Sequence, residues 1–285
     1  MGHSTYSRRY IGTTMKNITL VAIEFQWYDL TKYAIERSLD NIDVKDIVII
    51  SDKEIIPGAR HIICPPVADI SEYAEIMLKG TAEHVTTDHA LYVQWDGIAN
   101  DQAQWTDEFL KYDYIGAPWP WEPAPNNVGN GGFSLRSRKL LDACQDAEVS
   151  LTPAEPTAED KVIGMHKREY LESKYGIQFA PTELARKFSF ELGVHEPSFG
   201  FHGLWNVFNL MTDADMDYFV PLIDYNKWNI YKWHHVLAAV IRRNRMDIFT
   251  HMLSKLETHS PELVVPLTKW LEQDSQKPSS GLVIA

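Results

Sequence analysis

Short apolar runs alternate with amphipathic segments over the first hundred residues of the chain. The runs are rich in β-branched residues and almost continuously hydrophobic, which is typical of strands buried in a parallel sheet. They predict strands at residues 18–25, 46–51, 61–64 and 90–94. Residues 30–39 and 71–79 have helical spacing, with Ser71 as the expected cap of the second helix. This alternation predicts an α/β protein built on a parallel sheet.

The pattern changes at residues 112–132 (YDYIGAPWPWEPAPNNVGNGG), which are rich in Pro, Gly, Asn and Trp. We expect a long loop here, and long loops inside compact domains are usually functional. A strand at 133–136 follows, then a helix to about residue 147 that Ser137 caps. A further helix is expected over 158–174, with Gly176 as its stop signal.

The length of 285 residues fits one large α/β domain with an appendage. The C-terminal part is mostly helical in pattern, and residues 232–243 and 247–256 resemble a helical hairpin. We therefore divide the chain into a flexible N-terminal tail (1–16), an α/β domain (17–210) and a C-terminal helical extension (211–285).

Charge and composition narrow the classes of function. The formal net charge of −12 repels phosphate backbones and argues against a strongly basic nucleic-acid-binding domain, although a local basic groove stays open. Cys64 and Cys144 are too few for a disulfide framework or a zinc site. No apolar run approaches the length of a membrane span, and the first 14 residues lack the apolar stretch of a signal peptide. The expected location is the cytoplasm.

Acidic residues lie at or just after the ends of three predicted strands. These are Glu24, Asp52 and Asp96, and open α/β sheets bind ligands beyond the carboxyl ends of their strands. Asp96 belongs to the segment QWDG (94–97), where a carboxylate can hold a divalent cation that bridges a diphosphate. The same segment also fits an ordinary Asp-Gly turn at a strand end.

Three more segments carry candidate chemistry, each with a structural alternative. GNGG (129–132) lets the backbone approach a ligand closely, or makes a tight turn before a strand. TAED (157–160) fits a capping box whose acids complement the helix dipole, or supplies a general base. His202 in FGFHGLW (199–205) can ligate a metal or contact phosphate, or lie buried in an aromatic cluster. Trp119 and Trp121 can stack on a sugar.

Six segments occur in an order that resembles one protein family: VQWDG, YDYIGAPWPW, VGNGGFSLRS, AED, FAPTELARKFSFE and FGFHGLW. Together they resemble a family of uncharacterised proteins from bacteria, fungi and phages that is assigned to the GT-A-type glycosyltransferases. The resemblance covers roughly residues 17–207. It implies a GT-A-like fold, a Rossmann-like mixed sheet flanked by helices, in which a nucleotide-binding half joins an acceptor-binding half.

The resemblance also implies roles for residues. GT-A enzymes hold a metal and the donor diphosphate with Asp-x-Asp, of which this chain keeps only the last acid, so Asp96 and His202 are the expected ligands of Mn²⁺ or Mg²⁺. The acidic pair at a helix start is matched by Glu159 and Asp160, with Asp160 as the expected base. The residues expected to bind the nucleotide-sugar donor are Glu24, Phe25, Asp52, Lys79, Gln94, Trp95, Asp96, Trp119, Gly131 and Gly132.

The function so implied is transfer of a sugar, with inversion, from a nucleotide diphosphate donor such as a UDP-sugar to a hydroxyl acceptor. The acceptor is a surface glycan, a lipid precursor or a hydroxylated base of phage DNA. A basic groove would favour DNA, and its candidate residues are Arg136, Arg138 and Lys139, or Arg242, Arg243 and Arg245. The missing first acid keeps open a non-catalytic nucleotide- or sugar-binding module, and a sugar-nucleotide hydrolase is a third possibility.

Overall fold

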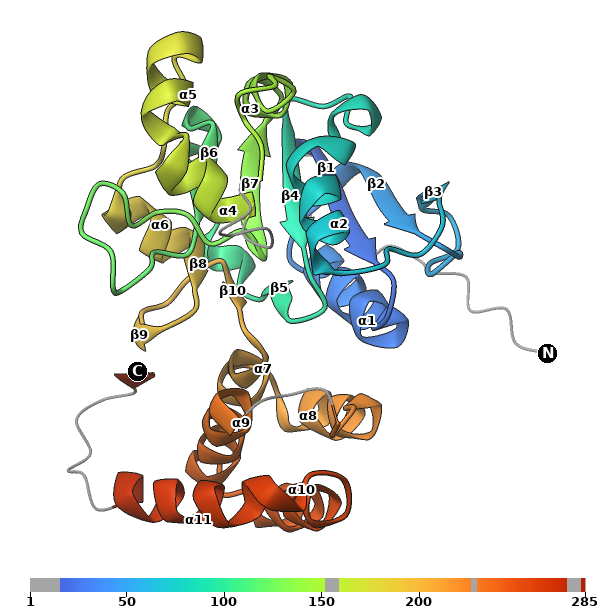
Figure 1. Ribbon diagram of the computed structural model, residues 1–285, viewed down its shortest axis with the longest axis vertical. Helices are drawn as coiled ribbons and strands as arrows, with labels where there is room; N and C mark the ends of the chain where they lie inside the picture. Colours follow the sequence, from blue (N-terminus) through green and yellow to red (C-terminus); the bar gives the residue numbers. More distant parts are fainter. Residues whose placement is uncertain (1–15, 152–158, 227–229, 276–282, 285) are drawn as a thin grey trace.

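A six-stranded mixed sheet forms the centre of the computed structural model, which describes residues 16–151, 159–226, 230–275 and 283–284 (Figure 1). The strands lie in the order β3-β2-β1-β4-β7-β6. In chain order they are β1 (Lys16–Glu24), β2 (Val44–Ser51), β3 (Arg60–Ile63), β4 (His89–Val93), β6 (Tyr114–Gly116) and β7 (Phe133–Ser137). The α/β class expected from the sequence is confirmed.

Alternate residues of β1 enter two separate hydrophobic cores, one on each face of the sheet. Ile18, Leu20 and Ala22 share a core with α1 (Tyr28–Leu39), whereas Val21 and Ile23 point into the opposite core. This alternation follows from the two-residue period of a strand. The second core is completed by α2 (Ile70–Glu75), the π-helix η1 (Ile76–Gly80) and α3 (Arg138–Ala143).

The direction of the strands divides the sheet into two parts. β1, β2, β3 and β4 are parallel, as the alternating pattern predicts. β7 runs antiparallel to both β4 and β6, so the whole sheet is mixed. β6 lies inside residues 112–132, where the prediction of an uninterrupted loop was wrong, because the Pro- and Gly-rich composition conceals a strand of three residues.

Two helix starts test the expected caps. Ser137 caps α3 as predicted, because its hydroxyl accepts a hydrogen bond from the backbone N–H of Leu140 at 3.0 Å. That helix ends at Ala143, earlier than expected. Ser71 is not a cap: α2 begins at Ile70, and the carboxylate of Asp69 accepts hydrogen bonds from the backbone. An aspartate at that place satisfies the same N–H groups.

The helix predicted over 158–174 is broken in the structure. It consists of α4 (Glu159–Lys161), the π-helix η5 (Val162–His166) and α5 (Arg168–Tyr175). The break surrounds Gly164, where a Cβ would lie 3.3 Å from the Cα of Gly129. Gly176 ends α5 in the left-handed conformation, with φ 64°, as its stop signal predicts. Thr157, the expected cap of this segment, lies outside the described residues.

A three-stranded sheet joins two segments that are distant in the sequence. It consists of β5 (Gly97–Ala99), β10 (Gly200–His202) and β8 (Ser189–Phe190), which follows α6 (Thr182–Phe188). β10 and β5 are antiparallel, and His202 pairs with Gly97. The pairing therefore carries His202 to the residue that directly follows Asp96.

The C-terminal helices lie together at the lower end of the molecule in Figure 1. They are α7 (Leu204–Leu210), α8 (Asp213–Phe219), α9 (Ile230–Arg242), α10 (Met246–His259) and α11 (Pro261–Ser275). One hydrophobic cluster contains Leu20 of β1 and Trp233 of α9, so these helices share a core with the sheet. The expected domain boundary at residue 210 stays a prediction. Among the helices that the structure describes, none has the length and hydrophobicity of a membrane span.

The remaining elements are short. The 3₁₀ turns are η2 (Ala82–His84), η3 (Gln102–Gln104), η4 (Asp107–Lys111) and η6 (Val220–Leu222). A two-stranded pairing joins β9 (Gly193–Val194) to β11 (Val283–Ile284), so the end of the chain returns to the α/β part. Residues 1–15 of the expected tail lie outside the described residues, and Lys16 already belongs to β1.

Candidate active site

Two successive glycines before β7 touch two different groups of polar side chains. A Cβ on Gly131 would lie 2.4 Å from Oε1 of Glu159, and a Cβ on Gly132 would lie 2.1 Å from Nε2 of His202. Neither glycine could therefore be replaced without moving these side chains. The sequence left open a close approach to a ligand or a tight turn; the structure adds a third reason, the close approach of the protein's own functional groups.

His202 is held between carboxylates on both ring nitrogens. Nδ1 lies 3.1 Å from Oε1 of Glu191, and Nε2 lies 3.2 Å from Oε1 of Gln94 and 3.4 Å from Oδ1 of Asp96. Burial alone would lower the pKa of His202, but the two negative charges outweigh it and raise the pKa to about 10. The imidazole is therefore not the aromatic-cluster residue that the sequence allowed.

Asp96 occupies the turn between β4 and β5. The backbone N–H of Gly97 donates to the carbonyl of Gln94 at 3.0 Å, so the expected Asp-Gly turn is present. The carboxylate is 5% exposed, and burial acts to raise its pKa, but the charge and hydrogen bond of His202 lower it below its usual value. The Asp-Gly turn that ends β4 therefore also places the carboxylate of Asp96 in the candidate site.

Glu191 is a residue of this site that the sequence reasoning missed. Its Oε2 accepts a hydrogen bond from Nδ2 of Asn130 at 2.9 Å, which links His202 to the glycine-rich segment. Its backbone carbonyl accepts from Nε1 of Trp205 and Nδ2 of Asn206. The only available signal was its place as the last residue of FAPTELARKFSFE, since no spacing connects it to His202.

Arg136 holds the side chain of Glu159 beside Gly131 of the glycine-rich segment. Its buried guanidinium donates to Oε1 of Glu159 at 3.0 Å and to the carbonyl of Met77 at 3.0 Å, and it lies 4.1 Å from the ring centre of Tyr92. Met77 belongs to the π-helix η1, a type of distortion that is frequent at functional sites. Glu159 is therefore an ion-paired, positioned carboxylate.

Asp160 differs from its neighbour Glu159. Its carboxylate accepts hydrogen bonds from the backbone N–H of Gly131 at 3.2 Å and of Lys161 at 2.8 Å. Burial and the negative charge of Glu159 raise the pKa of Asp160 to about 7. Asp160 therefore exchanges a proton near neutral pH, which is what a general base requires.

The acids at the ends of β1 and β2 are engaged by the protein itself. Oε1 of Glu24 accepts backbone N–H groups of residues 25–27, and Oε2 accepts the hydroxyl of Thr31 at 2.7 Å. Asp52 accepts the hydroxyl of Tyr28 at 2.8 Å, and burial together with this contact raises the pKa of Tyr28 to about 12. Glu24 thus closes the turn from β1 into α1, next to the buried side chain of Phe25.

Tyr73 of α2 lies between these strand ends and the group formed by Gln94, Asp96 and Glu159, and no local motif predicts it. Its hydroxyl accepts a hydrogen bond from Nε2 of Gln94 at 3.0 Å. Burial raises its pKa, and the charges of Glu24, Glu159 and Asp96 raise it further, so all three act on one phenol. Trp95, beside Gln94, lies 5.3 Å from the ring of Trp27.

Two expected donor-binding residues are engaged by the protein itself. The ammonium of Lys79 donates to the carbonyl of Asp146 at 3.2 Å. Trp119 is 3% exposed, and its ring fills the space beside Gly129, where a Cβ would lie 2.3 Å from the ring. Trp119 therefore supports the glycine-rich segment, while Trp121 is 58% exposed.

The expected cation can be tested against the donor atoms present. Oε1 of Gln94, Oδ1 of Asp96 and Nε2 of His202 converge. Amide oxygen, carboxylate and imidazole together suit Mn²⁺, provided that the cation displaces the proton that the raised pKa of His202 keeps on the ring. Within the described parts of the chain, no group of three or more His, Cys, Asp or Glu side chains is arranged to hold a metal. The residues fit a cation only with the amide of Gln94 and with further ligands from solvent or donor.

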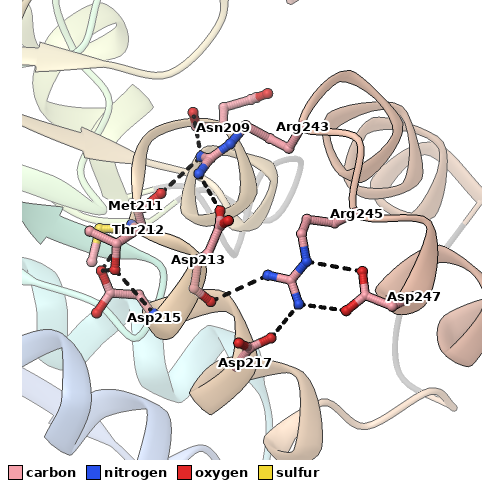
Figure 2. Close-up of polar contacts among 9 residues, drawn as sticks. All are labelled: Asn209, Met211, Thr212, Asp213, Asp215, Asp217, Arg243, Arg245 and Asp247. Carbon is pink, nitrogen blue, oxygen red and sulfur yellow. Dashed lines mark hydrogen bonds and ion pairs between the residues drawn. The ribbon is translucent and has the colours of Figure 1, made fainter.

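The candidate basic groove is not formed by its expected residues. Arg136 is buried, Arg138 pairs with Asp142, and Lys139 lies 3.3 Å from Asp113. Figure 2 shows that Arg243 and Arg245 likewise point at acids of the C-terminal helices. The ion pairs join Arg243 to Asp213, and Arg245 to Asp217 and Asp247; Arg242 donates to Asn209. A carboxylate thus pairs with Arg136, Arg138, Lys139, Arg243 and Arg245.

A family model described as a protein of unknown function, DUF5672, matches residues 63–202, just under half of the chain. The match contains the candidate residues from Lys79 to His202. No curated protein matches the chain.

Two solved structures of glycosyltransferases match at low similarity. One is a glycosyltransferase involved in the glycosylation of the major capsid of PBCV-1, with 12% identity and a TM-score of 0.42, covering 72% of this chain and 99% of that chain. The other is glucosyl-3-phosphoglycerate synthase from Mycobacterium tuberculosis in complex with Mn²⁺, UDP and glucosyl-3-phosphoglycerate, with 13% identity and a TM-score of 0.39, covering 58% of this chain and 68% of that chain. Both TM-scores are too low to support an argument about function.

Proposed function

We propose that the chain is a nucleotide-sugar-dependent glycosyltransferase that inverts the anomeric centre. One observation carries the proposal: two adjacent glycines contact two different ionisable side chains. Gly131 donates to Asp160, whose pKa is about 7, and Gly132 lies against the imidazole of His202, which carboxylates flank. Transfer of a sugar to a hydroxyl needs a base that takes the acceptor proton and a positively charged group that stabilises the departing diphosphate. Asp160 and His202 are suited to these two tasks.

In the proposed reaction, the acceptor oxygen attacks the anomeric carbon while the carboxylate of Asp160 takes the hydroxyl proton. The bond from the anomeric carbon to the diphosphate oxygen breaks, and its electron pair leaves with the nucleoside diphosphate. A single displacement of this kind inverts the anomeric centre. The N–H groups of Gly131 and Lys161 orient Asp160 for this proton transfer.

Glu159 acts as a positioning residue in this proposal. Its charge keeps the pKa of Asp160 raised, and Arg136 keeps the Glu159 carboxylate in place. Without Glu159, Asp160 would be a weaker base at neutral pH, because a lower pKa reduces the driving force for accepting a proton.

We assign the donor side to Gln94, Trp95 and Asp96, and add Tyr73 to the residues expected from the sequence. A UDP-sugar is the donor class that we propose. A divalent cation held by Asp96, His202 and Gln94 would supply positive charge to the donor diphosphate. Glu24 would act by holding the turn after β1 in shape, since both of its oxygens already accept hydrogen bonds.

The test is a panel of nucleotides and nucleotide sugars read by thermal shift, with and without Mn²⁺. A ligand at 100 times its dissociation constant stabilises the folded chain by about 2.7 kcal/mol, which such a measurement resolves. Binding of a nucleotide sugar, followed by transfer to an added acceptor, is the expected result. Release of free sugar at the same rate with and without acceptor would identify a hydrolase instead. No shift with any member of the panel would overturn the proposal.

A further inference from the structure

A cleft of about 380 Å³ opens beside the candidate active site. Its walls come from the loop between β6 and β7, from α6 and from the segment around β8 and β9, which lie close together on the left of Figure 1. Pro118 and Leu192 contribute partly exposed apolar surface, while Trp119 and Phe190 are buried beneath it. The lining of the cleft is thus partly apolar.

Two residues connect this cleft to the proposed chemistry. Glu191 lines the cleft and also bonds His202 and Asn130. Trp119 lines it from the other side and packs against Gly129 and Gly164, the glycine of the helix that follows Asp160. A ligand in the cleft would therefore contact Glu191, the residue that holds the imidazole of His202, and would lie one side chain away from it.

Ser189 indicates that the cleft is built for a polar ligand. The residue is fully buried, it lines the cleft, and its hydroxyl has no hydrogen-bond partner among the described residues. Buried hydroxyls are nearly always hydrogen-bonded, so such an orphan calls for a partner from outside the chain. Asn127, also in the lining, accepts from Thr182 through Oδ1 and keeps its Nδ2 to donate.

The charge of the lining restricts the ligand further. The lining contains three carboxylates, Glu122, Glu191 and Glu196, and one guanidinium, that of Arg186, which lies 3.9 Å from Glu196. Carboxylates accept hydrogen bonds from sugar hydroxyls, whereas they repel phosphate, sulfate and uronate groups. The whole chain adds to this repulsion with its net charge of −12.

We propose that this cleft binds the acceptor and that the acceptor is an uncharged saccharide. The term acceptor rests on the proposed transferase function; the binding of a neutral saccharide does not. Of the acceptors that the sequence left open, a surface glycan fits this lining, and a base of phage DNA does not.

The test is an array of immobilised neutral, uronic-acid and sulfated oligosaccharides, together with single-stranded DNA, probed with the full chain. Neutral glycans are the expected hits. Ser189→Ala removes only an unpartnered hydroxyl, so its melting temperature should stay near that of the wild type while its affinity for the hit falls severalfold. Glu122→Gln with Glu196→Gln should weaken the same binding by about tenfold and weaken the exclusion of acidic glycans.

Ser173→Ala and Glu257→Gln, two exposed substitutions away from the cleft lining, are the matched controls and should bind as the wild type. Hits confined to acidic glycans or DNA, hits that the cleft variants leave unchanged, or no hit at all would overturn the inference. A chain that binds neutral glycans but no nucleotide sugar would reject the transferase function alone. A chain that binds nucleotide sugars but no glycan would reject the cleft alone.

Discussion

The Cα of Gly132 lies against the imidazole of His202, so closely that a methyl group there would stand 2.1 Å from Nε2. The same ring is fixed on its other side by Glu191, 3.1 Å from Nδ1. The ring therefore cannot move away from a larger residue without breaking a hydrogen bond to a carboxylate. The position of His202 depends on the absence of a side chain at residue 132.

We expect Gly132→Ala to destabilise the chain by about 1–3 kcal/mol, the usual cost of overpacking a well-filled site. In a His202→Ala background the space is available, so the same substitution should cost under about 1 kcal/mol. Urea denaturation of the wild type, both single variants and the double variant measures this coupling. Additive losses would mean that the two residues do not determine each other's position.

Asp160→Asn should lower kcat/KM for transfer by about 10²–10⁴-fold, the range for removal of a general base. Because Asp160 acts in its ionised form with a pKa of about 7, the wild-type rate should fall as the pH drops below 7. The variant should lose this acidic limb and keep its thermal shift with the nucleotide sugar. Asp40→Asn, at an exposed helix end, is the control. An unchanged pH profile in Asp160→Asn would remove Asp160 from the mechanism.

The raised pKa of Asp160 should also make the folded chain less stable as the pH rises, whereas the proposed reaction becomes faster. Its pKa is about 7 in the folded chain and about 3.9 when unfolded, so between these values the folded state holds a proton that the unfolded state has lost. Stability therefore falls as the pH rises from about 4 to about 7. Asp160→Asn cannot titrate, so its melting temperature should exceed the wild-type value by a few degrees at pH 8. The difference should shrink towards pH 4, and a variant less stable than the wild type at pH 8 would contradict the raised pKa.

The sequence predicts those elements of the fold that depend on neighbouring residues, and it does not predict those that depend on contacts between distant residues. β1, β2 and β4 were recognised because a strand buried on both faces needs a continuous apolar run, which is a local signal. Short β6 carries too few residues to show a period. Likewise, a π-helix such as η5 depends on packing at Gly164, which propensity does not encode.

The candidate site divides in the same way. Asp96, Asp160 and His202 could be predicted as candidates because each lies in a distinctive local motif. Glu191 and Tyr73 were missed because their roles come from side chains distant in the sequence, at His202 and Gln94. Arg136 was noticed only as a surface charge, and its burial against Glu159 could not be inferred from the letters around it.

Breaking the Arg136–Glu159 pair should be costly. Arg136→Met leaves the Glu159 carboxylate buried without its partner, which we expect to cost about 3–5 kcal/mol. Combining it with Glu159→Gln removes the uncompensated charge and should recover part of the loss. Urea midpoints of the wild type and of these two variants measure this. A loss below about 1 kcal/mol for Arg136→Met would show that the pair behaves as an exposed salt bridge.

Glu159→Gln by itself tests the positioning role of the carboxylate. Removing its charge takes away one cause of the raised pKa of Asp160, so the acidic limb of the pH–rate profile should move to lower pH. The rate at the optimum should fall far less than in Asp160→Asn, because the proton-accepting group is retained. A profile that stays in place, with an equal loss of rate at every pH, would indicate that Glu159 only supports the fold.

The last prediction concerns the cation. If Gln94, Asp96 and His202 hold Mn²⁺, its addition should raise the melting temperature of the wild type in a concentration-dependent way, because a ligand of the folded state alone stabilises it. His202→Ala and Asp96→Asn should abolish this shift, while His251→Ala, which removes an exposed histidine on α10, should keep it. Chelation with EDTA should return the wild type to its starting value. A shift that survives in His202→Ala would place the cation elsewhere. No shift in the wild type, with or without a nucleotide diphosphate, would mean that the protonated imidazole of His202, and not a cation, stabilises the departing diphosphate in the proposed reaction.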